Sequence, residues 1–143
     1  MGKDFKLKIF QNTLSGEKHY ALVKNLKKND EPKYVRMHKL DITKDIFEEK
    51  NLFGDEISKS FKIIEERGSG AIVLINSDMA PKIEKIFNRR ETKDNKLELR
   101  EYGVGAQILL ELGLRKIILL SNSNKKIIAL DGFNLEIVDQ EKI

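Results

Sequence analysis

Two short, unbroken apolar runs constrain the fold of this chain more than any other feature of its sequence. They span Ala71 to Ile75 and Ile117 to Leu120. A strand with one solvated face alternates apolar and polar residues, whereas a strand covered on both faces reads as a continuous apolar run. The runs therefore predict two strands of a largely buried sheet with helices packed against it, which is an α/β arrangement.

The residues before the first run have the periodicity of an amphipathic helix. Asp55 is a candidate N-cap, and Gly68 lies where a C-cap glycine is expected. Between them, apolar residues recur at intervals of four and three: Ile57, Phe61 and Ile64. We therefore expect a helix that ends at Gly68 and leads directly into the buried strand.

Two further helices are expected between the apolar runs. Pro81 fits the first turn of one, whose buried stripe is formed by Ile83, Ile86 and Phe87. The other is preceded by Gly103 and Gly105 and ended by Gly113, and its apolar positions have helical spacing: Val104, Ile108, Leu109 and Leu112. Residues 88–96 are polar, which predicts an exposed loop between the two helices.

Both ends of the chain are expected to form strands. Apolar and charged residues alternate over 5–9, Ser15-Gly16 supplies a turn, and His19 to Lys24 is extended again, which predicts a hairpin. Tyr34 to His38 reads as a third strand, and Leu135 to Val138 as the last one. The amino-terminal part of the chain is thus expected to be rich in β-structure.

Composition bounds the class of protein. The chain has 143 residues, 40% of them hydrophobic and 35% charged, so it is sized for one folded domain with a substantial core. It contains no cysteine, which excludes disulfides, thiolate-bound zinc and cysteine nucleophiles. No apolar run approaches the roughly 20 residues of a membrane span, and no segment like a signal peptide follows Met1. We therefore expect a cytoplasmic protein that does not enter the membrane.

The charge pattern does not indicate a nucleic-acid partner. The formal net charge is +4, but cationic and acidic residues are interspersed over most of the chain. The nearest approach to a basic block, Lys24 to Lys28, lacks interleaved aromatic residues and is followed by Asp30 and Glu31. A solvated surface explains this block without a nucleic acid.

Three groups of polar residues are candidates for chemistry, and each has a structural alternative. His38, Asp41 and Asp45 supply one imidazole and two carboxylates, which either bind a divalent cation or end a strand and cap a turn. Glu98 and Arg100 either move a proton and stabilise a phosphate or form an ordinary ion pair.

The third group, Ser121 to Lys126, directly follows a buried strand. Ligand loops of open α/β sheets lie outside the carboxyl ends of the strands, so its hydroxyls, amides and ammonium groups suit a phosphate or a nucleobase edge. A helix N-cap at Ser123 with solvated lysines explains the same residues without a ligand.

Several segments resemble the GTP cyclohydrolase II family. The most specific are Arg100 to Leu110, Leu112 to Lys116, Leu119 to Asn122, Lys125-Lys126 and Gly132 to Val138. The amino-terminal half of the family is matched in the right order by Tyr20 to Lys24, Val35 to His38, Thr43, Asp45 and Phe47. The resemblance implies a single GTP cyclohydrolase II-like α/β domain over 1–143, with a mixed sheet, flanking helices and a β-rich amino-terminal part. It also implies a role at the first committed step of riboflavin synthesis.

The chain departs from this family where the family holds its zinc ion and the triphosphate. Asp41 and the stretch Asn51 to Gly54 stand where the resemblance implies three zinc-binding cysteines, so the zinc is predicted to be lost and no metal ligand is assigned. Ser77 to Ala80 replaces a Gln-Glu-Gly-Arg loop that clamps the triphosphate in the family. A catalytic tyrosine of the family has no counterpart.

Part of the family's pocket is retained. By resemblance, Glu98 corresponds to the proton acceptor and Arg100 to the nucleophilic arginine, both of them vestigial without the metal. Residual nucleotide contacts are implied for four residues: Arg36, His38, Ser121 and Lys126.

The resemblance therefore favours a degenerate domain that is inactive as a cyclohydrolase. It is closest to the cyclohydrolase-like carboxy-terminal domain of two-domain 3,4-dihydroxy-2-butanone 4-phosphate synthases, so we expect a fused synthase, a homodimer, and a role in assembly or regulation. Two alternatives stay open. One is an active hydrolase with a harder metal such as magnesium on His38, Asp41 and Asp45. The other is a sensor that binds GTP or another purine or flavin precursor through Arg100, Ser121 and Lys126.

Overall fold

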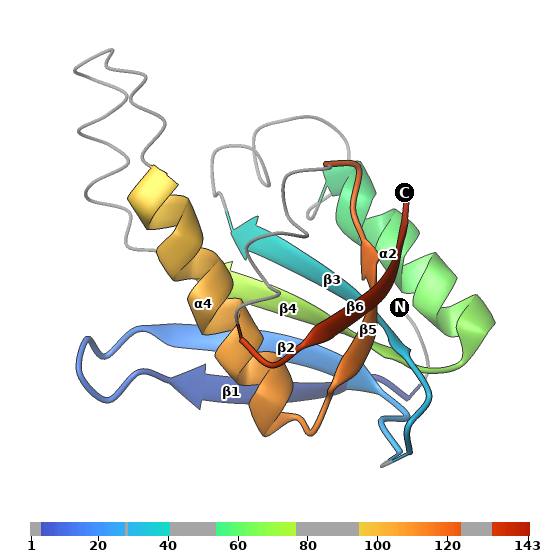
Figure 1. Ribbon diagram of the computed structural model, residues 1–143, viewed down its shortest axis with the longest axis horizontal. Coiled ribbons are helices and arrows are strands. Elements are labelled where there is room, and N and C mark those ends of the chain that lie inside the picture. The colour runs from blue at the N-terminus through green and yellow to red at the C-terminus, as the bar shows by residue number, and fades with distance from the viewer. Residues whose placement is uncertain (1–3, 28, 41–53, 77–94, 124–132) are drawn as a thin grey trace.

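The computed structural model describes residues 4–27, 29–40, 54–76, 95–123 and 133–143 (Figure 1). Its elements, in chain order, are β1 (Lys6–Gln11), β2 (Lys18–Lys24), β3 (Lys33–Leu40), α2 (Gly54–Arg67), β4 (Gly70–Asn76), α4 (Asn95–Glu111), β5 (Lys116–Leu120) and β6 (Glu136–Glu141). The predicted helix after Pro81, and residues 88–94 of the predicted loop, lie outside the described residues.

One mixed sheet organises the described residues. Its strand order is β1-β2-β4-β3-β5-β6. The four neighbours from β4 to β6 run parallel, while β2 pairs antiparallel with both β1 and β4. The predicted α/β class, with a GTP cyclohydrolase II-like mixed sheet, flanking helices and a β-rich amino-terminal part, is confirmed.

The two helices α2 and α4 cover opposite faces of the sheet (Figure 1). Alternate residues of β4 divide between the two cores: Val73 packs in the core beneath α4 with Leu109, and Ile72 packs in the core beneath α2 with Ile64. Every residue of β4 except Asn76 is buried. The continuous apolar run therefore predicted a strand covered on both faces correctly.

Glycines shape the turns that the sequence predicted. Gly16 has a φ of +75° in the β1–β2 turn, where its N–H donates to the carbonyl of Asn12 at 2.8 Å. Gly68 has a φ of +84° and its N–H donates to the Ile64 carbonyl at 2.8 Å, which ends α2 as a C-cap. The N-cap prediction is wrong, because α2 begins at Gly54 and Asp55 lies in its first turn.

Helix α4 is longer than predicted. It begins at Asn95, so Asn95 and Lys96 are helical where the polar composition predicted a loop. The helix contains Gly103 and Gly105 instead of following them, and both positions lie close to other parts of the chain. A Cβ on Gly105 would be 2.0 Å from Cε of Met37 on β3.

The last strand is also displaced from its predicted bounds. It starts at Glu136 and continues to Glu141, whereas Leu135, predicted to begin it, is buried just before the strand. Pairing of β5 with β6 shifts register between Ile117 and Ile118. No helix within the described ranges is long and apolar enough to cross a membrane.

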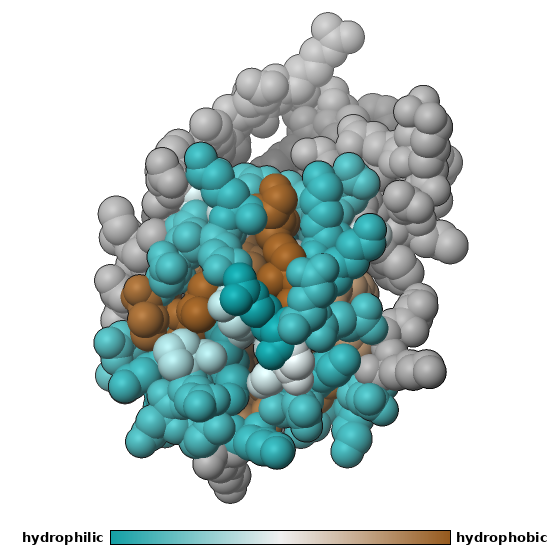
Figure 2. Space-filling view, turned by 90° about the vertical axis from the view of Figure 1, so that its right-hand side faces the viewer, coloured by the Kyte–Doolittle hydropathy of each residue, from teal (hydrophilic) through white to brown (hydrophobic). Residues whose placement is uncertain are grey.

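The sheet has two edge strands, β1 and β6. Large apolar side chains are exposed on both, including Leu7 at 58% and Ile9 at 60% on β1 and Val138 at 49% on β6. Figure 2 shows a surface that is mostly hydrophilic on one side of the molecule and is interrupted by apolar patches. Lys6 and Lys8 alternate with the apolar residues of β1, and lysines on an edge oppose uncontrolled strand pairing.

The start of β4 leaves no room for a side chain at Gly70. A Cβ there would lie 2.5 Å from the backbone oxygen of Tyr34 and 2.9 Å from Cγ1 of Ile64. We expect Gly70→Ala to lower the free energy of unfolding by about 2–3 kcal/mol, since a backbone atom cannot rotate away. Chemical denaturation monitored by circular dichroism measures this value.

Gly105→Ala is the comparison. Its nearest neighbour is the flexible end of Met37, and alanine gains about 1 kcal/mol of helix propensity over glycine. The loss at Gly105 should therefore be at least about 1 kcal/mol smaller than the loss at Gly70. Equal losses at both positions would contradict the assigned contact with Tyr34.

Candidate functional site

The carboxyl ends of three parallel strands meet at one edge of the sheet. β3 pairs in parallel with β4, bringing Leu40 opposite Asn76, and it also pairs in parallel with β5. Helix α4 begins on the same side of the sheet (Figure 1). Open α/β sheets bind their ligands at this edge, so it is the candidate functional site.

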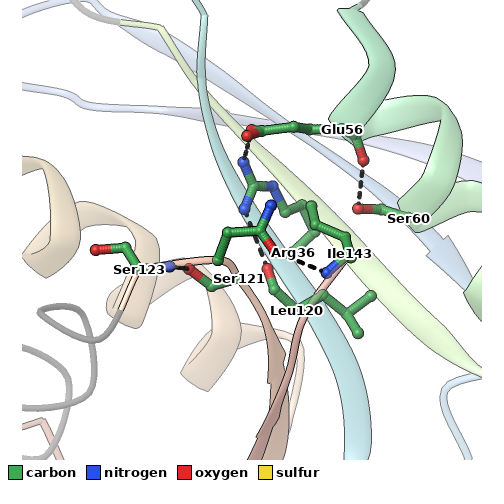
Figure 3. A network of polar contacts seen from close by, with 8 residues as sticks. Arg36, Glu56, Ser60, Leu120, Ser121, Ser123 and Ile143 are labelled. Atoms are coloured by element: carbon green, nitrogen blue, oxygen red, sulfur yellow. Dashed lines mark hydrogen bonds and ion pairs between the residues drawn. The ribbon is translucent and has the colours of Figure 1, made fainter.

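Arg36 of β3 is a buried cation at this edge, with 5% of its surface exposed. Its Nη1 donates to the backbone oxygen of Leu120 at 3.1 Å, and its Nη2 donates to Oε2 of Glu56 in an ion pair. Figure 3 shows the guanidinium between the start of α2 and the end of β5. Arg36 therefore joins three elements that are far apart in the sequence.

The charge of Arg36 needs this partner. Burial lowers the pKa of the guanidinium, and the negative charge of Glu56, together with Tyr102, opposes that shift. Arginine stays protonated in proteins, so the cation cannot escape the cost of burial by losing its proton. Its Nε has no hydrogen-bond partner within the described residues, which leaves the Glu56 pair as its main compensation.

Ser121 is held at the end of β5 by β6. Its N–H donates to the carbonyl of Glu141 at 2.9 Å, and its own carbonyl accepts from Nε2 of Gln140 at 3.1 Å. Its Oγ accepts the N–H of Ser123 at 3.1 Å (Figure 3). Only 1% of Ser121 is exposed, so its hydroxyl is already part of a local turn.

The other predicted site residues are placed less completely. His38 is half-buried on β3, opposite Leu74 of β4, two residues along the strand from Arg36. Glu98 and Arg100 lie in the part of α4 that begins at the carboxyl edge. Lys126 lies outside the described residues. The structure thus brings Arg36, His38 and Ser121 to one edge and puts Glu98 and Arg100 on a helix that begins beside it.

His19 is a feature of this edge that sequence reasoning missed. It is 3% exposed, and its Nδ1 accepts the N–H of Asn76, the last residue of β4, at 3.1 Å. Its Nε2 lies 3.7 Å from Oε2 of Glu17 and has no hydrogen-bond partner among the described residues. Burial lowers the pKa of His19, and the charge of Glu17 opposes the shift. The neutral imidazole therefore holds the end of β4.

Glu56 was also missed, because a carboxylate in the first turn of an amphipathic helix reads as solvated. The available signal was Arg36 itself, a cation in a strand whose neighbours Val35 and Met37 are apolar. Alternation puts Arg36 on the opposite face of the strand from Val35 and Met37, so the sequence shows neither that Arg36 is buried nor which carboxylate pairs with it.

The donor set of the chain does not fit a thiolate zinc site. The chain has no cysteine, so the three sulfur ligands implied by resemblance cannot be supplied. Within the described ranges, no group of three His, Cys, Asp or Glu residues is arranged to hold a metal ion. Asp41 and Asp45 lie outside those ranges, and a magnesium site with His38 stays a prediction.

Comparison with known proteins shows which family and which relatives this chain is similar to. A family model described as GTP cyclohydrolase II matches residues 1–142. The riboflavin biosynthesis protein RibBA of Cytophaga hutchinsonii is 35% identical over 95% of this chain and 37% of its own length. The protein of the same name from Aquifex aeolicus is 36% identical over 97% of this chain and 38% of its own length. This chain therefore spans little more than a third of either relative.

Glu56, through its ion pair with Arg36, is predicted to stabilise the fold more than Asp55 does. Glu56→Gln should lower the free energy of unfolding by about 1–3 kcal/mol, because a buried guanidinium loses its countercharge. Asp55→Asn is the matched control, since Asp55 shares the first turn of α2 and pairs at 3.6 Å with the exposed Lys59. Its effect should stay within about 0.5 kcal/mol. Similar losses in both variants would contradict the assigned role of Glu56.

His19 predicts a loss of stability in acid. Its pKa is lowered in the folded protein, so below the unfolded value of 6.5 the unfolded chain binds the proton more readily. The free energy of unfolding should therefore fall as the pH drops below 6.5, until the folded imidazole is itself protonated. His19→Gln should reduce this pH dependence between pH 6.5 and 5 in denaturation curves. An unchanged slope would show that other groups cause it.

Proposed function

The chain belongs to the GTP cyclohydrolase II family. From that premise we propose that it is a protein of riboflavin biosynthesis that has lost the zinc-dependent reaction of the family. The single observation that carries the proposal is the absence of cysteine from all 143 residues. Zinc bound to a protein makes a nucleophile of water near neutral pH. A chain without thiolates does not hold that ion in the way the family does.

The polar contacts at the carboxyl edge support the same proposal. Arg36 and Ser121, which the resemblance assigns to nucleotide contacts, both make contacts within the protein. The Arg36 guanidinium is neutralised by Glu56, and the Ser121 hydroxyl accepts the N–H of Ser123. A triphosphate would have to compete with Glu56 for the charge of Arg36. Ser77 to Ala80, which stands where the resemblance implies a triphosphate-binding loop, contains no arginine that could take over from Arg36.

We further propose that the chain works as part of a larger protein. It spans 37–38% of the RibBA relatives, which leaves room in them for another domain. The partner proposed by resemblance is a fused 3,4-dihydroxy-2-butanone 4-phosphate synthase, which the domain would assemble as a homodimer or regulate in the cytoplasm. Its two edge strands provide surfaces for such assembly.

Loss of the reaction is tested by assaying the purified protein with GTP and added zinc or magnesium. We expect no release of formate and no diaminopyrimidine product above the protein-free blank, because the thiolate ligands are absent. A GTP cyclohydrolase II that carries the three cysteines, assayed in parallel, shows that the conditions support turnover. Product formation that depends on added metal would overturn the proposal.

Retained nucleotide binding is a second candidate, because the Ser121 hydroxyl at the ligand edge of the sheet accepts the N–H of Ser123 and keeps its own proton to donate to a ligand. Calorimetry with GTP should then show saturable binding that Arg100→Gln weakens by about tenfold, the loss typical of one charge-assisted contact. Lys62→Met, which removes an exposed charge from α2, serves as the control. A flat titration with GTP and with flavin precursors would remove this candidate.

A further inference from the structure

A cavity lies at the end of the sheet opposite the candidate site, where β3 and β5 begin. It has a volume of about 380 Å³ and is open to solvent. One wall is formed by described residues of the connection between β2 and β3, namely Leu26, Lys27, Asn29, Asp30, Glu31 and Lys33. The other wall is the turn from Leu112 to Lys116 between α4 and β5. Because β3 runs from this cavity to the carboxyl edge, the cavity is separate from the candidate site described above.

The lining of this cavity is cationic. Among the residues that the structure describes there, four are cationic and two are acidic: Lys27, Lys33, Arg115 and Lys116 against Asp30 and Glu31. Leu26, Leu112 and Leu114 add apolar surface to the same walls. A ligand of complementary chemistry carries about two negative charges and a small carbon skeleton.

Lys33 distinguishes this cavity from an ordinary charged surface, because it is buried. It is 5% exposed, and its Nζ donates to Oδ1 of Asn29 at 2.8 Å. An ammonium has three protons to donate, and within the described ranges no carboxylate pairs with this one. Buried charges in proteins are normally paired, so Lys33 has capacity for an anion.

Hydrogen bonds within the protein fix the walls of the cavity. Asn29 is oriented by a second contact, in which its Oδ1 accepts the N–H of Glu31 at 3.3 Å. At the end of α4, the Leu109 and Leu110 carbonyls are occupied by the N–H groups of Leu114 and Gly113, both at 3.0 Å. These contacts fix the walls of the cavity that the cationic residues line.

We propose that this cavity binds a small phosphate-bearing anion, either orthophosphate or a phosphate monoester of a small polyol. Phosphate carries the two charges that the lining lacks, and the planar fork of Arg115 suits its oxygens. The volume admits a monoester of this size, whose carbon atoms contact the leucines. The site is independent of the cyclohydrolase reaction, because it uses none of the residues at the carboxyl edge.

Calorimetry of the full chain with orthophosphate, glycerol 3-phosphate and uncharged glycerol tests the proposal. We expect saturable binding of at least one phosphate compound and none of glycerol. The stronger of the two distinguishes free phosphate from a monoester. In NMR spectra, the backbone amides of Gly113 and Lys116 should shift with the same saturation.

Three variants locate the binding. Lys33→Met should weaken it at least tenfold, and Arg115→Gln, an exposed position whose change spares the core, should weaken it severalfold. Lys62→Met on α2 removes the same charge away from the cavity and should leave binding unchanged. If Lys33→Met does not fold, Arg115→Gln decides. Absence of saturable binding, or equal binding by Arg115→Gln and the control, would overturn the proposal.

Discussion

Burial of β4 on both faces is the constraint on which the remaining architecture depends. Its neighbours β2 and β3 satisfy its backbone on either side, and α2 and α4 must cover its two faces. Parallel pairing of β3 with β4 and β5 then brings their carboxyl ends to one edge. A strand without a polar face cannot lie at the rim of the sheet, so β4 lies inside it. The candidate site lies where the carboxyl end of β4 meets that of β3.

Two buried cations, Lys33 and Arg36, lie on β3. Arg36, near the carboxyl edge, is balanced by a carboxylate of α2, whereas Lys33, at the other end, has an amide as its hydrogen-bond partner. The same physical cost therefore has different consequences. A cation that is already paired holds elements together, and a cation without a countercharge is available to an anionic ligand.

The chain has the expected sheet and helices although it has no cysteine. The sheet and both helices match the expected architecture without the thiolates that the resemblance assigns to zinc, since the hydrophobic cores do not depend on metal ligands. Arg36 and Ser121, which the resemblance assigns to nucleotide contacts, also make hydrogen bonds within the protein. These contacts give the chain a reason to keep both residues whether or not it binds GTP. Retention of such residues alone does not distinguish an active enzyme from an inactive one.

Local sequence determined most of the elements and the lack of thiolate ligands. The run from Ala71 to Ile75 specified a doubly covered strand, and the period of three and four residues before Gly68 specified α2, because both patterns are set by backbone geometry. Absence of cysteine was equally readable.

Only the tertiary structure decided which polar groups meet. Arg36 pairs with residues 20 and 84 positions away, and His19 with one 57 positions away. Periodicity assigns a side chain to a face of the sheet, but its partner on that face depends on strand order and on helix placement. Those are properties of the whole packed chain, and for that reason Glu56, His19 and the cavity at Lys33 could not be found from the sequence.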